Sequence, residues 1–176
     1  MMNILNLTYN RFMKTKAIPG LIILLMFLAS FSATAQKPDF SGEWKLNKEK
    51  TALADNSLFL AGITIKIKAD TLFTTRLYEN SNGEQYPFDE NVTLDGKEGK
   101  ITIYEMPRVT KATGINEDGS INVESKTTFY NNGAEDNLVA KETWKIAGDT
   151  NMLTIEFKNA MAAGEATGTL YFTKVK

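Results

Sequence analysis

Apolar and polar residues alternate along most of the chain beyond residue 39. Ile63, Ile65 and Ile67 share one phase, and the residues between them are Thr or Lys. A period of two residues is typical of strands with one buried and one solvated face, and no long stretch has the period of a helix. The alternation predicts strands at residues 40–46, 61–68, 71–79, 85–94, 100–105, 108–115, 120–130, 137–146, 151–158 and 166–175.

Turn signals punctuate these segments. They are Asn82-Gly83, Asp95-Gly96, Asp118-Gly119, Asn132-Gly133 and Gly148-Asp149. Asn-Gly and Asp-Gly pairs tolerate the positive φ angles of tight turns, so each one predicts a hairpin. Met106-Pro107 predicts a bend between two further strands, because Pro cannot donate to a central ladder.

The short links predict an all-β, antiparallel up-and-down meander. A meander of eight to ten strands closes into a barrel to remove its exposed edges. We therefore predict a single barrel domain over residues 36–176. An immunoglobulin-like sandwich is the alternative, and the short links disfavour it because Greek keys need long crossovers.

The first 35 residues have the pattern of a cleaved signal peptide. A basic start at Lys14 and Lys16 is followed by an apolar run and then by small residues, which predicts cleavage between Ala35 and Gln36. Met13 opens a complete signal by itself, so it is an alternative start. The apolar run is shorter than the roughly 20 residues of a membrane span. We expect an exported protein, periplasmic or secreted, from a Gram-negative bacterium, with no span after signal removal.

Composition excludes several classes of function. The chain has no His and no Cys, which excludes Ser-His-Asp and Cys-His catalysis, His-ligated zinc, disulfides and lipid anchoring through a Cys. Removal of residues 1–35 leaves 141 of the 176 residues, with 17 basic and 21 acidic side chains and a formal charge of −4. This balance disfavours nucleic acid and anionic membranes as partners. We expect a monomer that holds no cofactor or metal.

A motif opens the first predicted strand. Phe40, Gly42, Trp44 and Leu46 share one face of the string Asp-Phe-Ser-Gly-Glu-Trp-Lys-Leu-Asn. This string resembles the Gly-x-Trp signature of lipocalin-like domains in exported bacterial proteins, which belong to the calycin superfamily. The motif is specific over residues 39–50, and the predicted layout extends the resemblance across the mature chain.

The resemblance implies a calycin barrel of eight to ten strands that binds a small apolar or amphipathic molecule. It also implies structural roles for three residues. Gly42 lets the chain cross the barrel end closely, Trp44 packs across that end, and a basic residue of the last strand lies over the indole. Lys174 is the best match to that basic residue, where the family commonly has a guanidinium.

Polar side chains in an apolar phase are candidates for a ligand site. Glu142 shares the phase of Trp144, and a buried carboxylate needs a partner. Arg76 is a candidate partner if the set of alternating residues that contains it in segment 71–79 faces the interior. The other set is equally apolar, so the sequence does not decide which set is buried. Glu90 is also a carboxylate in an apolar phase and would need a partner if buried. For Glu142, the alternative is a solvated position at the rim of the barrel. The predicted ligand-site residues are Arg76, Tyr78, Tyr86, Phe88, Phe129, Glu142 and Trp144.

Three functions follow from this sequence. The first is an exported binding protein for an apolar or amphipathic small molecule, with an internal cavity. The second is an extracytoplasmic interaction or structural module with a filled barrel. An isomerase or cyclase is the least favoured, because no catalytic constellation is recognised. Adjacent residues on a strand point to opposite faces, so the carboxylates of Asp89-Glu90 cannot flank one bond. Glu135-Asp136 lies in the predicted turn beside Asn132-Gly133 and is expected to be solvated.

Overall fold

The computed structural model describes residues 37–52, 58–131, 133–147 and 151–175. The predicted signal peptide and its cleavage point between Ala35 and Gln36 lie outside these residues. The described part contains ten strands and no helix long and apolar enough to cross a membrane. The strands are β1 (Gly42–Leu46), β2 (Phe59–Lys68), β3 (Thr71–Glu79), β4 (Gln85–Thr93), β5 (Asp95–Ile103), β6 (Met106–Thr113), β7 (Ile121–Asn131), β8 (Ala134–Ala147), β9 (Met152–Met161) and β10 (Gly164–Lys174).

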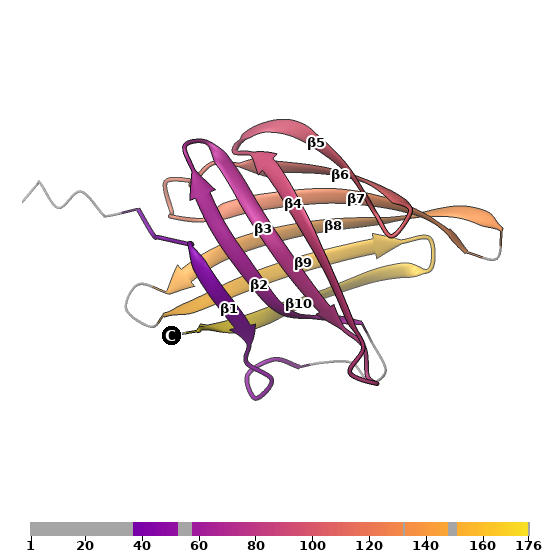
Figure 1. The fold of residues 1–176 in the computed structure, drawn as a ribbon, viewed down its shortest axis with the longest axis horizontal. Coiled ribbons are helices and arrows are strands. Elements are labelled where there is room, and N and C mark those ends of the chain that lie inside the picture. Colours follow the sequence, from indigo (N-terminus) through magenta and orange to yellow (C-terminus); the bar gives the residue numbers. More distant parts are fainter. Residues whose placement is uncertain (1–36, 53–57, 132, 148–150, 176) are drawn as a thin grey trace, which may run out of the picture. The chain divides into compact units, whose positions relative to one another are not determined.

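All ten strands belong to one antiparallel sheet. Its order is β4-β3-β2-β1-β10-β9-β8-β7-β6-β5, so strands that are consecutive in sequence pair with one another except β4 and β5, and β1 also pairs with β10 (Figure 1). The first and last strands meet where Trp44 pairs with Lys174. The predicted all-β meander is confirmed, and it forms a nearly closed barrel. One continuous sheet excludes the immunoglobulin-like alternative.

The barrel has a seam between β4 and β5, the two strands at the ends of the sheet order. Each has one hydrogen-bonded neighbour, β3 for β4 and β6 for β5. Side chains cross this seam instead: the Tyr104 hydroxyl donates a 2.7 Å hydrogen bond to the Pro87 carbonyl oxygen. Gly99 of β5 brings its backbone so close that an added Cβ would lie 3.1 Å from the Asn91 carbonyl oxygen. Because β4 has no hydrogen-bonded neighbour on the side of the seam, Pro87 can lie in this strand without the loss of a ladder hydrogen bond.

The turn between β5 and β6 lies slightly earlier than the sequence predicts. Tyr104 and Glu105 adopt positive φ angles of 48° and 66°, and β6 already begins at Met106. Two consecutive left-handed residues form the tight hairpin turn that matches the twist of the flanking strands. The bend predicted at Met106-Pro107 is therefore wrong by two residues, and Pro107 lies inside β6 opposite Thr102.

The inward phases of the strands form the core. The buried apolar side chains are Phe40, Trp44, Leu46, Leu60, Ile63, Ile65, Leu72, Val92, Ala112, Ile121, Val123, Ala140, Trp144, Leu153, Ile155 and Phe172. Most lie toward the end where β1 begins and β10 ends, which we call the sealed end. Toward the opposite end, the inward positions Tyr78, Phe88, Phe129, Phe157 and Leu170 are only half-buried. We call this the open end.

Candidate functional site

Four charged side chains meet inside the barrel between the sealed and open ends. They are Arg76 of β3, Glu90 of β4, Arg108 of β6 and Glu142 of β8, and we call them the charged layer. Arg76, Glu90 and Arg108 are buried, and the Glu142 side chain keeps 11% of its surface exposed. Because Leu72 and Thr74 are also buried, the phase of β3 that carries Arg76 faces inward.

Arg76 and Glu142 form a two-point ion pair across the interior. Arg76 Nη1 donates to Glu142 Oε1 at 2.9 Å, and Arg76 Nη2 donates to Oε2 at 2.8 Å. The Trp144 indole Nε1 also donates to Glu142 Oε2, at 2.7 Å. A forked arrangement of this kind fixes both the distance and the plane of the two groups. The structure thus places three of the predicted ligand-site residues in direct contact.

Glu90 and Arg108 form the second pair, across the seam. Arg108 Nε and Nη2 donate to the two oxygens of Glu90 at 3.0 and 3.4 Å. The Thr110 hydroxyl donates to Glu90 Oε1, and Arg108 Nη1 donates to Thr127 Oγ1 at 3.0 Å. Buried charges are tolerated when they are paired and hydrogen-bonded, and both carboxylates of the layer meet this condition.

The two pairs approach one another at Arg76 Nε. This atom lies 4.0 Å from Glu90 Oε2, too far for a hydrogen bond, and it is a buried donor without a hydrogen-bond partner among the described residues. The layer contains two formal positive and two formal negative charges, so its sum is zero. A neutral layer with one free donor can accept a polar group but provides no excess charge to attract an ion.

The ion pairs shift the protonation of Arg76 and Glu142 in opposite directions. Burial alone would lower the pKa of Arg76, but the Glu142 carboxylate, with contributions from Tyr78 and Glu90, outweighs burial and holds that pKa above its ordinary value. Burial alone would raise the pKa of Glu142, but the charge and hydrogen bonds of Arg76 hold it below its ordinary value of 4.5, with help from Trp144. Both groups are therefore ionised at neutral pH, which disfavours a general-acid role for Glu142.

Aromatic rings flank the charged layer. The Arg76 guanidinium lies 5.3 Å from the centroid of the Trp144 ring, and the Arg108 guanidinium lies 5.5 Å from that of Phe88. Tyr78 stacks on Phe88 with centroids 6.0 Å apart and planes 8° apart. Planar guanidinium groups stack well on rings, so these contacts fix the orientation of both arginines.

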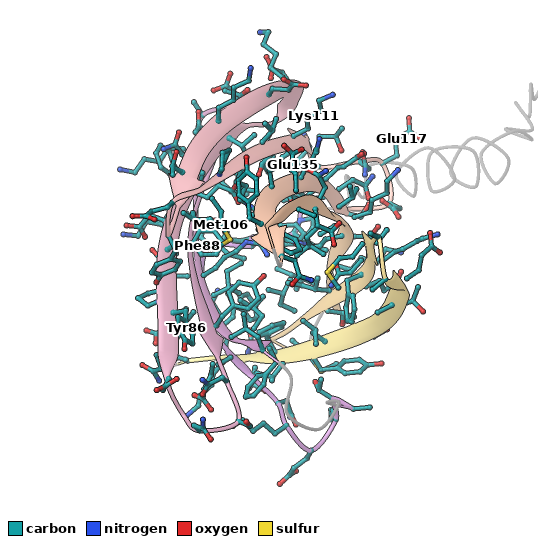
Figure 2. The ribbon with its side chains drawn as sticks, turned by 90° about the vertical axis from the view of Figure 1, so that its right-hand side faces the viewer. Tyr86, Phe88, Met106, Lys111, Glu117 and Glu135 are labelled. Carbon is teal, nitrogen blue, oxygen red and sulfur yellow. The ribbon has the colours of Figure 1, made fainter. Side chains whose placement is uncertain are left out.

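The open end is lined by half-buried apolar residues. Phe88 and Met106 lie near one another in the view of Figure 2, on the inner side of the sheet. Phe157 lies against its cross-strand partner Gly168, where an added Cβ would be 2.8 Å from the ring. The ring therefore lies along the wall of the barrel. Phe129, predicted as a ligand-site residue, is half-buried at the same end.

Tyr86 has a different environment from the other predicted ligand-site residues. It is 36% exposed at the start of β4, where its ring meets Tyr104 edge-on with centroids 6.2 Å apart. Its hydroxyl donates to Glu84 at 3.0 Å. Tyr86 thus lies by the β3–β4 hairpin rather than against the charged layer (Figure 2).

The three signature residues meet at the sealed end. Lys174 Nζ lies 5.2 Å from the centroid of the Trp44 ring, and the Trp44 indole N–H donates to the Phe40 carbonyl oxygen at 2.9 Å. Gly42 has a φ of +139°, and an added Cβ would lie 2.5 Å from Lys174 Cε. Gly42 therefore leaves the space through which the lysine stem reaches the indole.

Two hollows in the described part lie across the outer face of the sheet. A groove of about 360 Å³ crosses β2, β3 and β4, and outward side chains including Lys66, Lys68 and Phe73 line it. A second, of about 240 Å³, crosses β5, β6 and β7.

Arg108, its partner Thr127 and the Glu90 partner Thr110 are not among the residues predicted from the sequence. The sequence indicates Glu90 as a carboxylate in an apolar phase but does not assign it to a site. In the sequence, Arg108, Thr110 and Ala112 alternate along β6, but two of the three are polar and do not indicate a buried face. The structure shows that this face is buried and that Glu90 binds Arg108 and Thr110 there.

No group of three Asp, Glu, His or Cys residues in the described ranges is placed to hold a metal ion. Comparison with protein-family models, with curated proteins and with solved structures gives no match to this chain. The fold and site together define a nearly closed antiparallel barrel with a paired charged layer under a partly open aromatic end.

Proposed function

We propose that this protein binds a small apolar or amphipathic molecule at the open end of its barrel, outside the cytoplasm. The observation that carries the proposal is the half-burial of inward-facing aromatic side chains at one end of an otherwise well-buried core. Small-molecule sites are mostly apolar, with a few placed polar groups that orient the ligand. The open end supplies the apolar part, and the charged layer supplies the polar groups. The export pattern of residues 1–35 supports the location.

A specific alternative is an interaction module that uses its outer surface. The groove across β2–β4 and the 40% exposed Phe73 favour this second candidate. Two phenylalanines separate the possibilities because they lie on neighbouring strands with opposite facing. Phe88 points to the interior and pairs with Arg76, whereas Phe73 is exposed on the outer face and pairs with Asn91.

The first experiment uses the full chain produced in an exporting bacterial host. N-terminal sequencing tests cleavage before Gln36, and native mass spectrometry of gently purified protein detects any small molecule that co-purifies. A co-purified apolar molecule supports the binding proposal and identifies its class.

The second experiment is a titration with N-phenyl-1-naphthylamine, an uncharged apolar fluorophore. The proposal predicts saturable binding that Phe88→Ala weakens by about tenfold, equivalent to 1.4 kcal/mol, while Phe73→Ala leaves it unchanged. Thermal melts establish that both variants are folded at the titration temperature. Absence of saturable binding, or equal effects of the two variants, contradicts a site inside the barrel.

A further inference from the structure

The charged layer also constrains the chemistry of the polar end of a bound molecule. Each arginine has its own carboxylate: Glu142 occupies Nη1 and Nη2 of Arg76, and Glu90 occupies Nε and Nη2 of Arg108. An anionic head group would add an uncompensated negative charge to a layer that is already neutral, and an ammonium group would add an uncompensated positive one. Burial of an unpaired charge is strongly unfavourable.

Asp136 strengthens the argument against an anion. It pairs across β7 and β8 with Phe129, so it shares the inner face near the open end. Its carboxylate accepts hydrogen bonds from the backbone N–H groups of Asn137 and Ala162, at 2.7 and 3.3 Å. A carboxylate ligand would approach this negative charge as it entered.

One hydrogen-bond donor in the charged layer lacks an acceptor among the described residues. Among the residues that the structure describes, none accepts a hydrogen bond from Arg76 Nε, and Glu90 Oε2 lies 4.0 Å away. A hydroxyl oxygen about 2.8 Å from both atoms would accept from Nε and donate to the carboxylate. An ether or ester oxygen can accept but cannot donate. A carboxylate can only accept, and Glu90 repels it.

The route to this place starts at the open end. Glu142 points to the interior, since it binds Arg76 across the barrel, and yet 11% of its side-chain surface is exposed. That exposure therefore comes from within the barrel. Solvent already reaches the edge of the charged layer, and a ligand head group that displaces the half-buried aromatic side chains would follow the same direction.

We infer that the bound molecule ends in an uncharged hydroxyl group, so that the protein selects apolar alcohols over the corresponding acids and amines. The hydroxyl lies between Arg76 Nε and Glu90, and the apolar chain lies among the aromatic side chains of the open end. This inference rests on the proposed function and assigns its ligand class.

The test is competition against N-phenyl-1-naphthylamine at pH 7 by four compounds with the same twelve-carbon chain. These are 1-dodecanol, dodecyl methyl ether, dodecanoate and dodecylamine. We expect 1-dodecanol to bind at least about tenfold more tightly than each of the others, because a site that bonds a hydroxyl rejects analogues that cannot replace both hydrogen bonds. Equal affinities, or tighter binding of the acid or the amine, overturn the inference and leave the proposed function standing. If neither the fluorophore nor any of the four compounds binds, both fail together.

Glu142→Gln supplies the matched change. It leaves Arg76 with an unpaired positive charge, so the ratio of dodecanoate to dodecanol affinity should rise by at least about tenfold. Glu79→Gln is the control, because Glu79 pairs with Lys48 on the exterior at the same end of the barrel, 3.2 Å apart. It should leave the ratio unchanged.

Should Glu142→Gln fail to fold, the double variant Arg76→Met with Glu142→Leu removes both charges together. It should bind the fluorophore, lose the preference for dodecanol over the ether, and gain no preference for dodecanoate. A retained alcohol preference in this variant overturns the assignment to Arg76 Nε.

Discussion

Arg76 and Glu142 face one another across the interior of the barrel, joined by two hydrogen bonds of 2.9 and 2.8 Å. They come from β3 and β8, which are not neighbours in the sheet, where β2, β1, β10 and β9 separate them. The pair therefore links opposite walls through the core rather than along the ladder. This makes it both a structural crosslink and the polar floor of the proposed site.

A double-mutant cycle on this pair should show strong coupling. Arg76→Met alone leaves the Glu142 carboxylate without its main partner, and we expect it to lower the free energy of unfolding by about 3–5 kcal/mol. Arg76→Met combined with Glu142→Leu leaves no unpaired charge and should cost much less than the sum of the single variants. Urea denaturation of the four proteins measures this coupling. Additive effects would show that the two residues act independently.

The same pair predicts loss of stability in acid. The folded protein holds the pKa of Glu142 below its ordinary value of 4.5, so it binds fewer protons here than the unfolded chain. The resulting stabilisation is present above pH 4.5 and is lost as the pH falls through the folded pKa. As the pH falls below 4.5, the wild type should therefore lose more stability than the double variant.

Unfolding midpoints in urea across this pH range provide the measurement. Asp39, Asp95 and Asp118 also have lowered pKa values but are unchanged in the double variant, so their contributions cancel in the comparison. Parallel curves for the two proteins would contradict a stabilising role for ionised Glu142.

The alternation of residues was sufficient to predict the strands and the barrel, because a period of two reports burial directly. It could not determine which face of β3 is buried, since Phe73 and Leu77 make the outward phase as apolar as the inward one. The facing depends on Glu142, a partner from β8 that is distant in sequence. Periodicity within one strand contains no information about such a contact.

The failure to predict the Glu90–Arg108 pair of the charged layer has a similar explanation. Arg108 occupies an inward position of β6 because Glu90 crosses the seam to meet it at 3.0 Å. In the sequence it appears as an ordinary charge after a Pro. A carboxylate in an apolar phase is the only usable signal, and it indicates Glu90 without revealing that its partner is an arginine two strands further along the chain.

Gly42 and Lys174 provide a test of the sealed end. Gly42→Ala places a Cβ 2.5 Å from Lys174 Cε and forces a side chain onto a backbone with a φ of +139°, so we expect a loss of about 1–3 kcal/mol. In a Lys174→Ala background the steric part disappears and only the backbone part remains. The cost of Gly42→Ala should therefore be smaller there. Equal costs in both backgrounds, measured by urea denaturation, would show that Lys174 does not occupy the space over Gly42.

The seam between β4 and β5 predicts where the barrel opens most easily. Tyr104 spans it with one hydrogen bond to Pro87, and Tyr104→Phe removes that bond but retains the ring that meets Tyr86 edge-on. We expect a small loss of global stability, about 0.5–1.5 kcal/mol, together with faster amide hydrogen exchange confined to residues 85–103. Tyr130→Phe is the control, because Tyr130 is 74% exposed near the end of β7, away from the seam. Because no ladder hydrogen bonds join β4 and β5 at the seam, we expect the increase in amide exchange within residues 85–103 to exceed the increase that the loss of global stability alone would cause. Exchange that rises equally in all strands would instead mean that the seam opens only when the whole barrel unfolds.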